Sequence, residues 1–187
     1  FEGLAEHGVN ADGEETEVQF DENGKPLAIV FKTIADQYGR FSFFKVVSGK
    51  VTADMTLKKM RNRNSEKLGH LYEVCGKKNT ETKEVVCGDI AAVSKLNDTL
   101  TGDTLADPSL GITLDGIDFA EPCYSQAIAP KVKGTEDKIA AGLTKLRDED
   151  PTFTVVNNTE THQMVISGTG DIHLDVICSK LKSKFGV

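Results

Sequence analysis

Apolar and polar residues alternate along the first large part of the chain, starting at residues 27–31. This period of two predicts half-buried β-strands, because successive side chains of a strand point to opposite faces. Similar short runs follow at residues 40–47, 55–60, 68–74, 84–86 and 89–96, and glycines stand between or beside them. Short strands at this spacing, with no helical pattern among them, predict a closed or nearly closed β-barrel over residues 25–107.

The apolar spacing changes after a connecting segment at residues 108–119, which begins with a proline and has little periodicity. Residues 124–129 can form a strand, and Thr135 then suits the N-cap of a helix. The apolar face of that helix consists of Ile139, Leu143 and Leu146, which recur at the spacing of successive helical turns. Helix and strand therefore alternate in the second part of the chain.

Beyond Pro151, which is predicted to end this helix, the pattern indicates a β-hairpin and a second helix. Asn157 and Asn158 mark the hairpin turn between two short alternating runs. Asp171 can cap the second helix. The apolar stripe of that helix is formed by Leu174, Ile177, Leu181 and Phe185.

The order β-α-β-β-α over residues 120–187 is five-sixths of a ferredoxin-like split βαβ fold, in which two helices cover one face of a four-stranded antiparallel sheet. The chain ends where the fourth strand is expected, so we predict a truncated domain with an unpaired sheet edge. The predicted fold class is therefore a multi-domain chain, with a β-barrel followed by an α+β ferredoxin-like domain that lacks its last strand.

Charge is distributed unevenly along a chain whose formal net charge is −7. Residues 1–24 hold eight acids and no Lys or Arg, which predicts an acidic linker or the tail of an upstream domain. Residues 45–83 hold ten Lys or Arg against four acids, so a basic face on the barrel is expected. Its most basic part, around an Asn-rich turn, carries Lys58, Lys59, Arg61, Arg63 and Lys67. This turn is either a solvated hairpin end or a contact for RNA phosphates that is indifferent to base sequence.

Sequence motifs for chemistry are missing from the chain. No GxxxxGK[ST] loop is present, so no nucleotide site is predicted. Gly168, Thr169 and Gly170 lead into a helix as a phosphate-binding turn does, but the Asp171 carboxylate would occupy the anion position, which favours a tight strand-to-helix turn. His173 in the first turn of this helix is interpreted as a surface or interdomain contact.

The cysteines also point away from metal or redox chemistry. Cys75, Cys87, Cys123 and Cys178 stand far apart without a CxxC pair, and they are interpreted as reduced, mostly buried thiols. We therefore predict no catalytic, cofactor-binding or metal-binding residue in this chain. No apolar run approaches the length of a membrane span, and we expect a soluble, cytoplasmic protein.

Long stretches of the sequence resemble elongation factor G, a translational GTPase. Its third domain is similar to TFTVVNNTETHQMVISGTGDIHLDVICSKLKSKFGV with the preceding KLRDEDP. Its second, barrel domain is similar, in the same order, to FFKVVSGKV, KLGHLYEVCGKK, KEVVCGDIAAV and TGDTLAD. GVNADGEE resembles the exit from the GTPase domain of the family. The resemblance covers roughly residues 8–187.

The resemblance implies a fragment without the GTPase domain that precedes it in the family and without the fourth and fifth domains that follow. Such a fragment is no enzyme and holds no cofactor, whereas its parent protein is a GTPase that binds GTP and Mg. The implied partners are the ribosome, through small-subunit rRNA and proteins, and in cis the parent's GTPase domain and domain IV.

Carried over by position, the small-subunit contact falls on the basic turn around Arg61 and Arg63. The interdomain relay surface, which passes on the nucleotide state, includes Asn157, Asn158, Thr161, Gly168, Thr169, Gly170, Asp171 and His173. Two alternatives stay open. A ribosomal protection protein shares these domains, and a stand-alone RNA-binding module would also explain the basic barrel.

Overall fold

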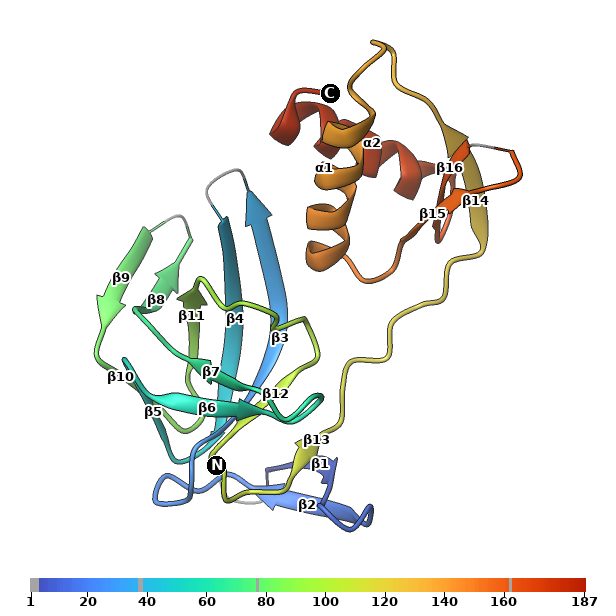
Figure 1. Cartoon of the computed structure of the whole chain (residues 1–187). Helices are drawn as coiled ribbons and strands as arrows, with labels where there is room; N and C mark the ends of the chain where they lie inside the picture. The colour runs from blue at the N-terminus through green and yellow to red at the C-terminus, as the bar shows by residue number, and fades with distance from the viewer. Residues whose placement is uncertain (1–3, 37–38, 77, 162) are drawn as a thin grey trace. The chain divides into compact units, whose positions relative to one another are not determined.

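The computed structural model describes residues 4–36, 39–76, 78–161 and 163–187, and the chain divides into two compact units (Figure 1). The first unit extends to Ile117 and consists of strands, whereas the second begins at Asp118 and combines strands with two helices. This confirms the predicted fold class of a β-barrel followed by a ferredoxin-like α+β domain.

The first unit is built around one eight-stranded antiparallel sheet in the order β7-β6-β12-β3-β4-β11-β8-β9, and β5 pairs with β10 beside it. The sheet curls around an apolar core that includes Val30, Phe44, Val46, Leu71 and Leu105. The strands of this unit are β1 (Ala5–Val9), β2 (Glu15–Gln19), β3 (Leu27–Asp36), β4 (Gly39–Ser48), β5 (Lys50–Thr52), β6 (Thr56–Lys59), β7 (Ser65–Lys67), β8 (Leu71–Cys75), β9 (Lys78–Thr82), β10 (Glu84–Val86), β11 (Ile90–Ser94), β12 (Thr104–Ala106) and β13 (Thr113–Leu114).

The acidic N-terminal segment forms two strands that join the first unit. Strands β1 and β2 form a hairpin, and β1 also pairs with β13, which lies inside the predicted linker at residues 108–119. Val18 and Phe20 pack against a small second cluster that contains Leu114. Lys45 lies with its Nζ 3.0 Å from Oε1 of Glu6 and 4.6 Å from the centre of the Phe20 ring. The first unit therefore includes this hairpin and reaches to Ile117.

The second unit contains a three-stranded antiparallel sheet in the order β14-β16-β15. Its elements are β14 (Tyr124–Ile128), α1 (Glu136–Glu149), β15 (Thr154–Asn158), β16 (Gln163–Gly168) and α2 (Asp171–Phe185). Both helices pack on the sheet through the predicted apolar positions, since Ile139, Leu143, Leu146, Leu174, Ile177 and Leu181 are buried together with Phe153 and Ile166. Within the described residues, β14 and β15 are the edge strands of this sheet.

Both predicted helix caps differ in detail from the structure. Thr135 occupies the N-cap position of α1, but its hydroxyl donates to the Val132 carbonyl oxygen at 2.7 Å. Its side chain therefore makes no capping hydrogen bond to the helix amides. The N-cap of α2 is Gly170, and Asp171 is the first helical residue. Its carboxylate still accepts a hydrogen bond from the Ile172 amide at 2.8 Å. Neither described helix is long and apolar enough to cross a membrane.

Candidate functional site

The basic turn predicted on the barrel is the hairpin of β6 and β7, in which Lys58 pairs with Ser65. The Lys59 amide donates to the Asn64 carbonyl at 2.8 Å, and the Arg63 amide donates to the Lys59 carbonyl at 2.9 Å. Arg63 itself adopts a left-handed backbone with φ of 62°. Backbone hydrogen bonds on both sides of the tip therefore fix the shape of this turn.

Lys59 points inward from this hairpin, and only 1% of its side chain is exposed. Its Nζ lies 3.4 Å from Oε1 of Glu66 and 3.1 Å from Oδ2 of Asp98. Glu66 is equally buried and also accepts hydrogen bonds from the Asn97 and Asp98 amides and the Thr99 hydroxyl. Since a buried ion pair needs such additional donors to offset its desolvation, Lys59 and Glu66 are a structural clamp between the hairpin and the loop at residues 97–99. Lys59 is not available to an external phosphate.

Arg61 is also bound within the barrel. Its Nε and Nη2 donate to the two carboxylate oxygens of the buried Asp103 at 2.7 and 3.2 Å, and Nη2 donates to the Asp98 carbonyl at 2.9 Å. The bidentate hydrogen bond to Asp103 raises the pKa of Arg61. The pKa of Asp98 lies below its usual value, chiefly because Lys59 donates a hydrogen bond to it. Nε and Nη2 of Arg61 therefore donate to groups of the barrel itself and are not free for an outside partner.

Three of the five predicted cations remain turned to solvent. Arg63 is exposed and Lys58 is half-buried, and neither forms an ion pair with a residue that the structure describes. Lys67 lies 3.0 Å from Oδ1 of Asp54, but both side chains are mostly exposed. Lys58 and Arg63 are thus the cations of this hairpin whose charge an outside partner can use.

The predicted relay residues fall at two places in the second unit. Gly168, Thr169, Gly170, Asp171 and His173 lie where β16 leads into α2. Asn157 and Asn158 were predicted to form the hairpin turn, but they are the last two residues of β15 and pair with Met164 and Gln163, and the turn with Thr161 follows them. In that turn the Asn158 side chain accepts hydrogen bonds from the Glu160 and Thr161 amides at 2.9 and 3.1 Å. The two groups lie at opposite ends of strand β16, and the structure does not bring them together.

His173 joins the turn to the end of helix α1. Its Nδ1 accepts a hydrogen bond from the Thr169 amide at 3.1 Å, and its Nε2 lies 3.1 Å from Oδ2 of Asp150. Because an amide can only donate, Nδ1 is the acceptor and Nε2 carries the proton that is donated to Asp150. An added Cβ at Gly168 would lie 2.7 Å from this Nδ1, so only glycine allows the imidazole to come so close.

Asp150 is the acceptor that orients His173. Burial disfavours its ionised form, but hydrogen bonds from the Thr152 hydroxyl and amide and from His173 outweigh it, and the pKa of Asp150 lies below its usual value. No pattern in the sequence pointed to Asp150, Glu66, Asp98 or Asp103 as site residues. Pro151, which follows Asp150, indicated only where the helix ends. Asp98 and Asp103 lie far from Lys59 and Arg61 in the sequence, so local patterns do not show that they meet.

Comparison with known proteins identifies the family to which the chain belongs. Residues 25–107 match the family described as Elongation factor G domain 2, and residues 119–187 match the family described as Elongation Factor G, domain III. The chain carries the second and third domains of the elongation factor G family. A crystal structure of a protein from Thermus thermophilus is similar at 26% identity with a TM-score of 0.75, over 88% of this chain and 25% of that protein. The chain therefore spans about a quarter of the length of this relative.

In these two elongation factor G domains, the described residues contain no group of three His, Cys, Asp or Glu side chains that could hold a metal ion. The barrel presents the β6–β7 hairpin with Lys58 and Arg63, and the third domain presents a turn that His173 connects to the end of α1.

Proposed function

We propose that this chain is the part of a translation elongation factor that binds the small ribosomal subunit and couples the nucleotide state of a GTPase domain to translocation. In this proposal the fragment itself performs no catalysis, and GTP and Mg belong to the GTPase domain of the whole cytoplasmic protein. Its own residues contribute two surfaces, the β6–β7 hairpin for rRNA and the β16–α2 turn for the relay.

The rRNA contact is supported most directly by a difference among the hairpin cations, of which two are bound to carboxylates of the barrel and two are not. Lys59 and Arg61 are bound to buried carboxylates, which holds the turn in one conformation. Lys58 and Arg63 keep their charge for a phosphate backbone, and because the backbone of the turn is already held, only their side chains lose conformational entropy on binding. Such contacts position a domain on RNA without reading its bases.

Ribosome binding by the intact factor tests this contact. Lys58→Glu with Arg63→Glu should weaken binding to small subunits and lower the slope of log affinity against log salt by about one per lost phosphate contact. The matched control is Lys78→Glu with Lys83→Glu, which makes the same charge change elsewhere on the barrel. Equal losses in both double variants would show a general effect of net charge and would contradict a contact at the hairpin.

The relay proposal rests on the β16–α2 turn, whose conformation depends on the hydrogen bonds of His173 to Thr169 and Asp150. His173→Ala in the intact factor should uncouple GTP hydrolysis from translocation, so that hydrolysis continues while translocation slows. An unchanged ratio of the two rates would refute a relay role for this turn.

A further inference from the structure

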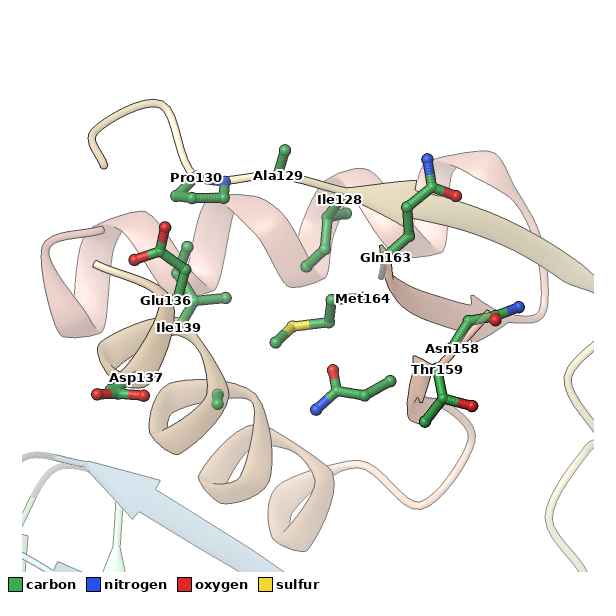
Figure 2. A pocket seen from close by; sticks show the side chains of 12 residues that line it. Ile128, Ala129, Pro130, Glu136, Asp137, Ile139, Asn158, Thr159, Gln163 and Met164 are labelled. Carbon is green, nitrogen blue, oxygen red and sulfur yellow. The ribbon is translucent and has the colours of Figure 1, made fainter. Parts of the chain in front are cut away.

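Two adjoining cavities lie between helix α1 and strand β15 of the second unit. Their volumes are about 550 and 180 Å³, and Ala140, Asn157 and Met164 line both. Because three residues line both, the two cavities adjoin along α1, and we call them together the α1–β15 groove. Figure 2 shows Ile128, Ile139 and Met164 pointing into its larger part.

The floor of the α1–β15 groove is apolar and incompletely covered. Ile128 and Met164 pack against the core of the second unit but remain only partly buried. A concave site of this size with an apolar floor and polar residues on its rim is typical of a binding site. The rim carries the side chains of Asn157, Asn158 and Gln163.

Strand β15 forms one wall of the groove, and its outer edge is open. In the described residues β15 pairs with β16 alone, so alternate residues of β15 point their amide and carbonyl groups away from the sheet. An edge strand beside a helix accepts an extended peptide, whose backbone pairs with the edge and whose alternate side chains enter the groove. The geometry of β15 and α1 fits this mode of binding.

Charges at the ends of the groove indicate the partner. Glu136 and Asp137 in the first turn of α1 line the larger cavity, and Arg147 in the last turn lines the smaller one. No Lys or Arg is among the described residues that line the larger cavity, so its charge repels phosphate and attracts a basic side chain. The rise of α1 between Asp137 and Arg147 is about 15 Å, which corresponds to about five residues of extended chain.

We propose that the α1–β15 groove binds an extended segment of a partner protein, which adds to the edge of β15 and places a Lys or Arg beside Glu136 and Asp137. This goes beyond the proposed function, because the β6–β7 hairpin addresses phosphates whereas the groove addresses a peptide. The two surfaces carry opposite charge and select different classes of macromolecule.

Nuclear magnetic resonance of the ¹⁵N-labelled chain tests the groove. The probe is a pool of capped peptides of about seven residues, in which Val, Ile and Thr vary at alternate positions and Arg occupies one end. Amide shifts should be confined to α1, β15 and the adjoining ends of β14 and β16. Polyuridylate serves as the competing probe. The proposal is overturned if no peptide shifts these amides at millimolar concentration, or if polyuridylate shifts them instead.

Backbone pairing is tested with two N-methylated versions of the tightest peptide, each modified at one alternate set of amides. One version should lose binding and the other should retain it, because a strand bonds to its neighbour through alternate residues only. If both versions bind like the parent peptide, no strand is added to β15 and the proposal fails.

Two pairs of variants test the groove from the side of the protein. Ala140→Phe should fill the groove and abolish binding, whereas Ala141→Phe, at an exposed position of the same helix, should not. Glu136→Lys should weaken binding of the Arg-bearing pool by about tenfold, and Asp175→Lys on α2 is its matched control. Unchanged affinity in Ala140→Phe would overturn the proposal.

Discussion

The buried pair of Lys59 and Glu66 offers the sharpest test of how the barrel holds its hairpin. Lys59→Met keeps the length and apolar stem of the side chain but removes the charge that neutralises Glu66. The carboxylate of Glu66, 3% exposed, would then keep only the Asn97 and Asp98 amides and the Thr99 hydroxyl as donors. Breaking a buried pair in this way costs about 3–5 kcal/mol.

A second substitution separates the lost charge from the lost packing. Glu66→Gln in the Lys59→Met background removes the unpaired charge while its amide oxygen can still accept hydrogen bonds from the loop at residues 97–99. We expect the double variant to recover about 2 kcal/mol of the loss, because an uncompensated buried charge costs more than a neutral hydrogen-bonding group. Lys67→Met is the control, since its pair with Asp54 is exposed and is worth less than about 1 kcal/mol.

Urea unfolding monitored by amide hydrogen exchange is the appropriate assay, because it reports the barrel and the ferredoxin-like unit separately. Barrel amides such as those of Val30 and Val46 should lose protection in Lys59→Met, whereas Leu143 and Ile177 in the other unit should not. If Lys59→Met costs no more than Lys67→Met, or if the double variant is no more stable than Lys59→Met, the reasoning on the buried pair is wrong.

Two further predictions concern backbone and pH. Gly49→Ala should destabilise the barrel by at least about 1 kcal/mol more than Gly102→Ala, measured by urea unfolding. Both residues have positive φ, but an added Cβ at Gly49 would lie 2.5 Å from the Gly24 carbonyl oxygen while that at Gly102 meets open space; equal losses would contradict the close approach. The pKa of Asp150 is lower in the folded chain than its unfolded value of about 4, so its ionised form stabilises the fold above that pH, and this contribution disappears as pH falls through the folded pKa. The difference in free energy of unfolding between wild type and Asp150→Asn should therefore shrink from pH 7 towards pH 3, and a difference that is constant with pH would contradict it.

Elements whose apolar residues follow one period could be predicted from the sequence. Both helices of the second unit bury the residues that the helical spacing predicted, and residues 84–86 form β10 as expected. Strands β4, β6 and β11 lie within one or two residues of their predicted bounds. In these segments each residue's environment is determined by its position on the element, so local periodicity carries the information.

Other strands could be recognised only in the folded chain. Strand β12 is buried on both faces and therefore shows no alternation, and β13 has only two residues. Strands β1 and β2 are short and acidic, and β1 also pairs with β13, which lies about a hundred residues later in the chain. Pairing between strands depends on partners that composition does not reveal.

The candidate sites divide in the same way. The sequence by itself determined that a basic turn stands on the barrel and that a Gly-rich turn precedes α2. Tertiary structure decided which charges remain available, because Lys59 and Arg61 meet Glu66, Asp98 and Asp103 only when separate strands and loops converge. It also created the α1–β15 groove, whose lining comes from helix and strands at once. The energy of a buried charge depends on its three-dimensional neighbours, and so does the shape of a groove, whereas the period of a strand or helix is already present in the order of the residues.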